Sequence, residues 1–349
     1  MRLLNDLRDA SRSYDRYKTD TVVAPNRLSV SGGALIVPAA TLRDAAYFPL
    51  DITPQALTQI CAKLGPTVFG KGSEKAIPRT YVEALPTDLR DAVLSRHLRD
   101  TRNGTWMVRA NDRSCRAVMD GNYPGGSSSG EYENTIYLSA LTELITDAGG
   151  AVSVRPRLDA DNVNIKIVWP VPGGGEAGRF GVGFHFGNSE AGQYKLRLLP
   201  LVQVTSCTNS VIGNSEVGGL ERIHRGSFAA LRTLFKAAIG DILGVSADMV
   251  ARMMEAEEER IPDFGNVIIG LAARHGWTED VSHAVAIGSG GQETRAGLVN
   301  GITFAAHSTQ KDAEEEVAME RLGGAILVAP GSLFYEAARR GARVEMEVR

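Results

Sequence analysis

The chain has few cysteines, and their spacing excludes two classes of small scaffold. Cys61, Cys115 and Cys207 are the three cysteines among 349 residues, and no C-x-x-C pair occurs. Disulfide frameworks and structural zinc sites both need more cysteines at closer spacing. The pattern argues against both and suits a reducing compartment, so we expect a cytoplasmic protein.

Long apolar runs are also absent. No run approaches the roughly 20 apolar residues that span a bilayer. The first segment, MRLLNDLRDASRSYDRYKTD, mixes charges and has no apolar stretch typical of a signal peptide. We therefore expect no membrane partner, and a host-cell cytoplasmic location if the protein is phage-encoded.

The balance of charge excludes a global basic field. The formal net charge is -3, with 43% hydrophobic and 23% charged residues, which is the composition of a globular protein. A uniformly basic surface is the usual sign of nucleic-acid binding. Any anionic partner must therefore be bound by a local patch.

Common catalytic motifs are missing as well. The sequence contains no G-x-x-x-x-G-K-[ST] loop, no H-E-x-x-H pair and no G-x-S-x-G elbow. The glycines at 173–175 precede a strand, whereas the dinucleotide fingerprint follows one, so they predict a hairpin turn. We expect no cofactor and no metal, and these absences favour a binding protein over an enzyme.

Periodicity predicts an α+β fold, with an antiparallel sheet core, flanking helices and a C-terminal helical lobe. Thr53-Pro54 opens a helix that should end at Gly65-Pro66. Four strands with short connections follow later and predict an antiparallel meander, near 151–157, 162–170, 179–186 and 194–206. Helical periodicity dominates after Arg222, with helices near 247–260, 263–274, 278–286 and 291–322. We predict an α+β domain at 1–220 and a mainly helical lobe at 221–349.

Arginine gathers around a predicted hairpin, with strands at 105–110 and 114–119 and a turn at Asn111-Asp112. A glycine- and serine-rich loop at 121–130 follows, which we expect to be mobile. Phosphates attract arginine and bases stack on aromatic rings, so this pattern is typical of a single-stranded nucleic-acid groove. The candidate phosphate ligands are Arg99, Arg102, Arg109, Arg113 and Arg116, and the candidate stacking residues are Trp106 and Tyr123. The alternative is a solvated arginine surface with a core tryptophan.

The word Gly-Asn-Ser-Glu-x-Gly occurs twice, beginning at Gly187 and at Gly213. Gly and Asn tolerate the left-handed region, and Ser or Asn can brace a turn through its own backbone. The flanking sequences do not align. We therefore interpret the two words as turns at the ends of one long strand.

Several segments resemble, in order along most of the chain, a phage- and plasmid-borne family of unknown function. The family is number nine hundred and thirty-two in the domain-of-unknown-function series. The similar stretches are DITPQALTQICAKLG, WMVRANDRSCRAVMDGNY, GVGFHFGNSEAGQYKLRLLPLVQVTSCTNSVI, ERIHRG and GITFAAHSTQKDAEEEVAMERLGGAIL. The residues that fall on the family's motifs are Asn188, Ser189, Glu190, Gly192, Cys207, Thr208, Asn209, Arg222 and His224. Ser210 stands where the family has glycine after C-T-N, and Asp120 stands where it has serine. The resemblance implies a phage, prophage or plasmid setting and DNA metabolism.

These observations favour a protein that binds single-stranded DNA without catalysis, as a recombination or annealing protein that forms homo-oligomers. The first alternative is an anti-restriction or other host-factor-binding protein that presents acidic helices at 255–260 and 312–316. Such acidic runs are more simply solvated helix faces. A metal-dependent nuclease is the third, and it requires a carboxylate cluster that spacing alone does not assemble.

Overall fold

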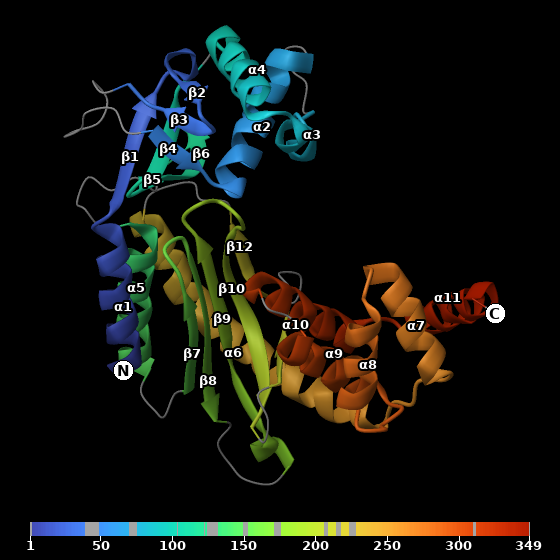
Figure 1. Cartoon of the computed structure of the whole chain (residues 1–349). Coiled ribbons are helices and arrows are strands. Elements are labelled where there is room, and N and C mark those ends of the chain that lie inside the picture. The colour runs from blue at the N-terminus through green and yellow to red at the C-terminus, as the bar shows by residue number, and fades with distance from the viewer. Residues whose placement is uncertain are drawn as a thin grey trace.

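The computed structural model describes residues 2–38, 49–69, 75–102, 104–121, 123, 132–148, 153–170, 176–205, 209–213, 218–222, 228–309 and 312–348. Two β-sheets organise this part of the chain into two lobes (Figure 1). The fold is α+β with mostly antiparallel strand pairs and helices gathered toward the C-terminus, as the sequence predicts.

The first lobe contains a sheet of order β1-β5-β6-β4-β3-β2. Its strands are β1 (Lys18–Val23), β2 (Ser29–Ser31), β3 (Ala34–Ile36), β4 (Pro49–Ile52), β5 (Trp106–Asn111) and β6 (Ser114–Asp120). Its helices are α2 (Pro54–Phe69), α3 (Arg79–Ala84) and α4 (Thr87–Asp100), with a short 3-10 turn, η1, at Pro25–Arg27. The hairpin of β5 and β6 is confirmed, and Asp112 turns it with a φ of 53°.

The second lobe contains the antiparallel meander, in the order β11-β10-β9-β8-β7. Its strands are β7 (Ser153–Leu158), β8 (Asn162–Pro170), β9 (Phe180–Ser189), β10 (Leu196–Val204), β11 (Ser210–Ile212) and β12 (Leu220–Arg222), and β12 also pairs with β10. A 3-10 turn, η3 (Glu176–Arg179), precedes β9. The meander predicted for this region is confirmed.

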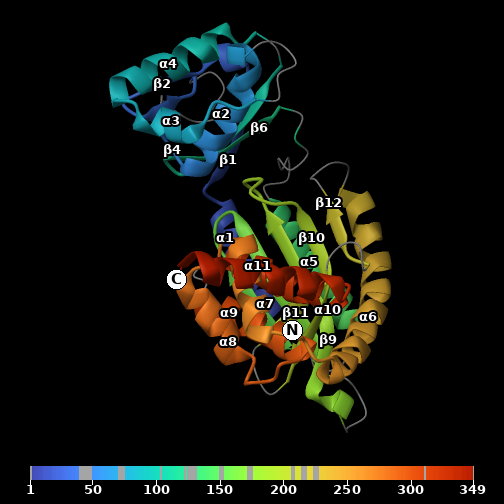
Figure 2. The ribbon, with the colours of Figure 1, turned by 90° about the vertical axis from the view of Figure 1, so that its right-hand side faces the viewer.

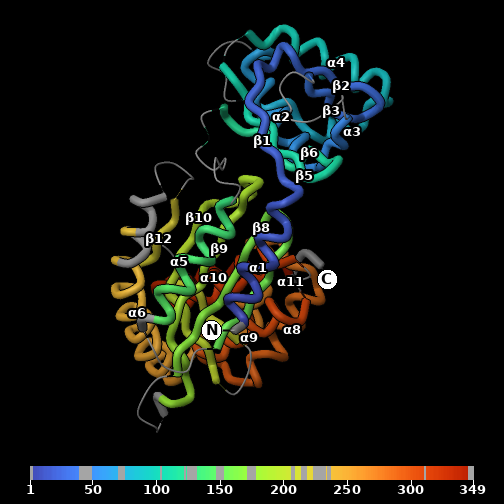
Figure 3. The backbone as a smooth tube through the Cα atoms, turned by 90° about the vertical axis from the view of Figure 1, so that its left-hand side faces the viewer, coloured from blue at the N-terminus to red at the C-terminus, as the bar shows by residue number. Residues whose placement is uncertain are grey.

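Helices cover both faces of this second sheet (Figure 2, Figure 3). On one face lie α1 (Arg2–Asp15), α5 (Glu133–Ala148) and the first half of α6 (Phe228–Glu258), around a core that includes Ile165, Phe184 and Ile242. The C-terminal helices are α7 (Phe264–His275), α8 (Glu279–Gly288), α9 (Arg295–Thr309), α10 (Ala313–Val328) and α11 (Ser332–Val348). Among them, α10 packs on the opposite face of the sheet.

The lobes divide the chain differently from the predicted boundary at residue 220. The first lobe comprises the described residues between 18 and 120, and α1 belongs to the second lobe because it packs on α5 and β7. α6 buries Met249 and Val250 in one core with Phe180 and Val202 of the sheet. The helical C-terminal third is therefore part of the second lobe and shares its core.

Several helix boundaries also differ from expectation. α2 continues through Pro66 to Phe69, so packing of its buried face outweighs the loss of one backbone hydrogen bond. The helix predicted at 291–322 is two helices, because Asp312 caps a new one by accepting a hydrogen bond of 2.6 Å from the Glu314 backbone N–H. The sequence did not predict α11. Among the described residues no single helix is long and apolar enough to cross a membrane. Residues 313–328 and 332–344, in α10 and α11, are bent by 118° and together have the length and composition of a broken span.

Candidate functional site

Polar side chains occupy the face of the second sheet that α10 covers. β8 alternates Val163, Ile165 and Ile167 on its apolar face with Asn164 and Lys166 on the other. Strand register extends this polar face across β7 to β9. Arg155, Lys166 and His185 lie opposite one another in one row, and Arg157, Asn164 and Gly187 lie in the next.

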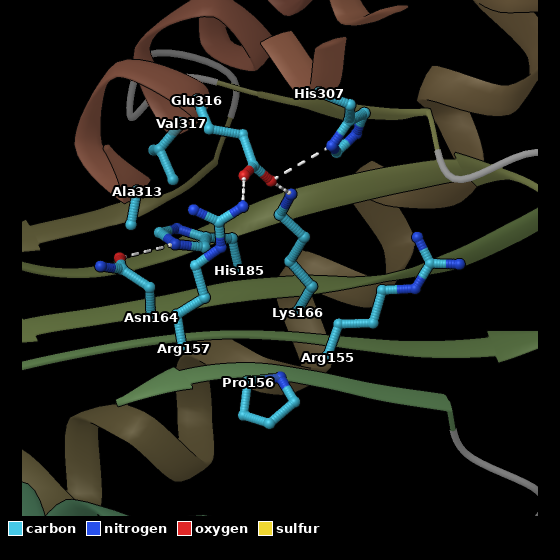
Figure 4. Close-up of a pocket in the computed structure, with 10 residues that line it drawn as sticks. All are labelled: Arg155, Pro156, Arg157, Asn164, Lys166, His185, His307, Ala313, Glu316 and Val317. Carbon is cyan, nitrogen blue, oxygen red and sulfur yellow. Dashed lines mark hydrogen bonds and ion pairs between the residues drawn. The ribbon is translucent and has the colours of Figure 1, made fainter. Parts of the chain in front are cut away.

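A pocket of about 370 Å³ opens above these two rows, between the sheet and the first turn of α10 (Figure 4). Its walls are Arg155, Pro156, Arg157, Asn164, Lys166, His185, His307, Ala313, Glu316 and Val317. Three of these residues are cationic and one is a carboxylate. The pocket is therefore locally basic although the chain is acidic overall.

Glu316 is the carboxylate on which this pocket converges. Its Oε1 accepts a hydrogen bond of 2.6 Å from Lys166 Nζ and lies 3.4 Å from His307 Nδ1. Its Oε2 pairs with the Arg157 guanidinium, whose side chain is 52% exposed. Burial raises the pKa of Glu316, but Lys166, His307 and Arg157 outweigh that effect and lower it. Glu316 is therefore ionised, and it is not the solvated helix residue that the acidic run predicts.

Lys166 links this carboxylate to a second one. Its Nζ also donates a hydrogen bond of 2.7 Å to Glu320 Oε1, and Glu320 is fully buried one turn along α10. His307, Glu316 and Glu320 offer ligand atoms within 4.8 Å of one another, a spacing that could hold a metal ion. The Lys166 ammonium already supplies a cation to both carboxylates, and a divalent ion beside it would be repelled. The cluster is therefore better described as a buried ion-pair network than as a metal centre.

His185 is fully buried in the wall of the pocket, and its tautomer follows from its neighbours. Tyr194 Oη donates to the Val163 carbonyl oxygen and accepts a hydrogen bond of 3.0 Å from Asn164 Nδ2. Asn164 Oδ1 therefore faces His185 Nε2, 3.2 Å away, which must carry the proton. Burial, followed by the charges of Lys166, Arg197 and Arg321, keeps the pKa of His185 well below its usual value. His185 is neutral, and its Nδ1 lone pair has no hydrogen-bond partner among the described residues.

A second polar network joins the two lobes around the N-S-E-x-G motif, and we call it the junction. Its charged members are Asp15, Lys18, Asp20, Arg109, Glu133 and Glu190. Arg109 binds Asp20 through two hydrogen bonds of 2.8 Å and donates a third, of 2.7 Å, to the Glu190 backbone carbonyl oxygen. The guanidinium also stacks on Tyr132, with 4.9 Å to the ring centroid.

Glu190 connects this junction to three other elements. Its carboxylate pairs with Lys18 of β1 and accepts a hydrogen bond of 2.6 Å from the backbone N–H of Asn134 in α5. Its own N–H donates to the Asp161 carbonyl oxygen. The side chain is fully buried, so the motif ties the first lobe to the second.

The junction holds more acids than bases. The four carboxyl groups face two cations, Lys18 and Arg109, in a mostly buried region. Burial, reinforced by Glu190 and opposed by Arg109, raises the pKa of Glu133 to about 8. Burial also raises the pKa of Glu190, against the effect of Lys18 and Arg109. Glu133 is therefore mainly protonated at neutral pH.

The junction accounts for several residues that the sequence assigned to nucleic acid. Arg109 is 0% exposed and fully engaged, so it cannot contact a phosphate in this structure. Trp106 is 5% exposed and belongs to the core of the first lobe, which agrees with the alternative interpretation. Tyr123 is partly buried and donates a hydrogen bond of 3.2 Å to Glu133.

The remaining arginines lie nearer the surface. Arg116 binds Asp161 of the second lobe through Nε at 2.7 Å and is one-third exposed. Arg99, Arg102 and Arg113 are exposed. Arg102 lines a groove of about 710 Å³ on the first lobe together with Lys63 and the edge of Trp106. Within the glycine-rich loop, 122 and 124–130 lie outside the described residues.

The residues that fall on the family-like motifs lie in different environments. Asn188, Ser189 and Glu190 are buried, and Asn188 donates a hydrogen bond of 2.7 Å to Asn134. Gly192 has a φ of 67°, which a glycine adopts without strain. Asn209 is partly buried and Arg222 is exposed at the end of β12. Cys207, Thr208 and His224 lie outside the described residues, as do 214–217 of the second word.

Sequence reasoning did not connect the residues of the pocket. The acidic run at 312–316 predicts a solvated face for Glu316. One signal was available: the central strand NVNIKIVW alternates apolar residues with Asn162, Asn164 and Lys166. Polar residues on one face of an otherwise apolar strand indicate a covered polar layer.

Comparisons of the chain with protein-family models, curated proteins and solved structures gave no match.

Proposed function

We propose that this protein binds the phosphate groups of single-stranded nucleic acid, without catalysis, in the pocket between the second sheet and α10. The observation that carries the proposal is the row of cations around this pocket. Arg155 and Arg157 alternate on β7, and Lys166 lies beside them on β8. Arginine forks suit phosphate oxygens, and the half-exposed Arg157 can reach a ligand from the open side.

The position of this pocket at an edge of the sheet supports a polymeric ligand. β7 ends the second sheet within the described residues, so Arg155 and Arg157 stand at an edge of the sheet. Exposed Arg99, Arg102 and Arg113 on the first lobe offer further contacts to a polymer that carries phosphates at regular intervals. The buried Arg109 and Trp106 and the partly buried Tyr123 have no part in the proposed binding.

Fluorescence anisotropy with a labelled single-stranded oligonucleotide tests the proposal. The variant carries Arg155→Gln and Arg157→Gln. Its control carries Arg339→Gln and Arg340→Gln, which make the same charge change on exposed residues of α11. We expect binding that weakens with salt, and a loss of about tenfold or more in the first variant alone. Absent binding, or equal binding by both variants, would overturn the proposal.

A binding measurement with a mononucleotide distinguishes a polymer ligand from a small phosphate ester. Binding of both probes at similar affinity would assign the pocket to a single phosphate group, and a clear preference for the oligonucleotide supports the polymer. An annealing role in phage or plasmid recombination and assembly into homo-oligomers belong to the same proposal. Light scattering with and without the oligonucleotide tests assembly, because an increase in particle mass on addition of DNA is expected.

A further inference from the structure

We infer that the Glu316 carboxylate occupies the position of the ligand's phosphate, and that the pocket is an oxyanion-binding site whose anion position is filled by this internal carboxylate. The inference rests on the proposed function and adds to it the group with which the ligand competes. Three side chains from three separate elements converge on this one carboxylate: Arg157 from β7, Lys166 from β8 and His307 from α9 (Figure 4).

The surroundings of Glu316 match the needs of a phosphate. A phosphate and a carboxylate both accept several charge-assisted hydrogen bonds, and arginine can bind either one with two N–H groups. Glu316 also lies in the first turn of α10, where the helix dipole favours negative charge. Each contribution that stabilises the ionised Glu316 would stabilise a bound phosphate in its place.

The balance of charge explains why Glu316 fills the anion position without a ligand. Arg155, Arg157 and Lys166 line the pocket, and Glu316 is the one carboxylate among its lining residues. Glu316 offsets part of this positive charge in the free protein. Removal of its charge leaves the cations facing the cavity, so an external anion then binds with less competition.

His185 gives an independent indication that the pocket receives a ligand. Its side chain is fully buried and lines the same cavity, and its Nδ1 lone pair has no partner among the described residues. An unpaired buried acceptor destabilises the protein that holds it. A ligand that carries an N–H or O–H donor beside its phosphate, as a nucleotide does, would pair with this acceptor.

The two halves of α10 contact the second sheet in different ways, and this difference allows the Glu316 side chain to move when a ligand binds. Further along the helix, Gly324 lies directly against the Ile212 carbonyl oxygen, which a Cβ would meet at 2.1 Å, and this contact anchors the C-terminal half. The N-terminal half contacts the sheet through the charged Glu314, Glu316 and Glu320 and through the buried Val317. The charged contacts of the Glu316 side chain can be exchanged for contacts to a ligand while Val317 remains in its apolar cluster.

The experiment compares Glu316→Gln with Glu315→Gln, which makes the same charge change on the neighbouring exposed residue. Isothermal titration with inorganic phosphate and anisotropy with the oligonucleotide measure both variants and the wild type. We expect Glu316→Gln to bind both probes about five- to tenfold more tightly, and Glu315→Gln to stay within about twofold of wild type. Addition of Arg157→Gln should abolish the gain.

The outcomes separate this inference from the proposed function. Wild-type binding that Glu316→Gln leaves unchanged or weakens overturns the inference and leaves the proposed function standing. Absence of binding by the wild type and by Glu316→Gln overturns both. If thermal unfolding shows that Glu316→Gln does not fold, Glu316→Asp replaces it, since the shorter side chain withdraws the carboxylate while keeping its charge. A gain in affinity is again expected, and unchanged affinity overturns the inference.

Discussion

Arg109 Nη1 of the first sheet donates a hydrogen bond of 2.7 Å to the backbone carbonyl oxygen of Glu190 at the end of the second sheet. The same guanidinium holds Asp20 on β1 by two further bonds. One buried side chain therefore joins the first lobe to the N-S-E-x-G turn of the second, and its charge stabilises the contact between the lobes.

Replacement of Arg109 by alanine should destabilise the protein strongly. The change leaves Asp20 and the Glu190 carbonyl oxygen buried without their partner, and such losses cost about 3–5 kcal/mol. Arg113→Ala, on an exposed neighbour in the same hairpin, should stay within about 0.5 kcal/mol. Urea unfolding followed by circular dichroism measures both, and equal stabilities would contradict the role given to Arg109.

Glu133 should make stability depend on pH in the opposite direction to a salt-bridged acid. Burial, the largest influence, raises its pKa in the folded protein to about 8 from an ordinary value of 4.5. The unfolded chain releases the proton first as pH rises, so stability falls between about pH 4.5 and pH 8 and then levels. Glu133→Gln removes this contribution.

Denaturant unfolding of wild type and Glu133→Gln at pH 5 and pH 8 checks this expectation. The variant should gain relative to wild type by up to a few kcal/mol at pH 8 and much less at pH 5. A stability difference that is the same at both pH values would show that Glu133 does not carry the proton.

His185 should remain neutral well below pH 6.5, as the Nε2–H tautomer. Burial, followed by Lys166, Arg197 and Arg321, lowers its pKa. The contribution of neutral His185 to the free energy of unfolding is therefore fully present above pH 6.5, the pKa in the unfolded chain. It is lost as the pH falls below that value. Nitrogen NMR of the imidazole reports both features, and a protonated ring or an Nδ1–H signal at pH 6 would refute the assignment. Asn164→Ala should remove the preference for one tautomer.

Two helical glycines should respond in opposite ways to alanine. In Gly324→Ala the new Cβ would meet the Ile212 carbonyl oxygen at 2.1 Å, so α10 must shift, at a cost of about 1–3 kcal/mol. Gly240 of α6 has nothing within 4 Å of that position, and its replacement should stabilise the helix by about 0.5–1 kcal/mol. Thermal unfolding midpoints give the sign of each effect directly.

Much of the fold could be predicted because it depends on local patterns. The hairpin at 106–120, the four-stranded meander and the helices α7 and α8 follow from alternation, turn residues and helical periodicity. The continuation of α2 through Pro66 and the extent of α6 did not follow. In α6, Ser246 bonds to the Gly183 carbonyl oxygen of the sheet, a long-range contact that no local pattern contains.

The candidate site depends more than the fold does on contacts between residues that are far apart in the sequence. Glu316 and Lys166 are 150 residues apart, and only the packing of α10 on the second sheet makes them partners. The arginine hairpin shows the same limit, because an arginine that faces solvent and one that faces a buried aspartate look alike in sequence. Asp20, 89 residues before Arg109, decides the difference.

The sequence by itself determined the α+β class, the hairpin, the antiparallel meander and the helical C-terminal third, since each is encoded by periodicity within one segment. Tertiary structure alone decided which charges are buried, because burial depends on what lies opposite a side chain after packing. Packing buries Arg109 and the N-S-E-x-G motif in the junction between the lobes. It also brings Lys166, His185 and Glu316 together in a pocket.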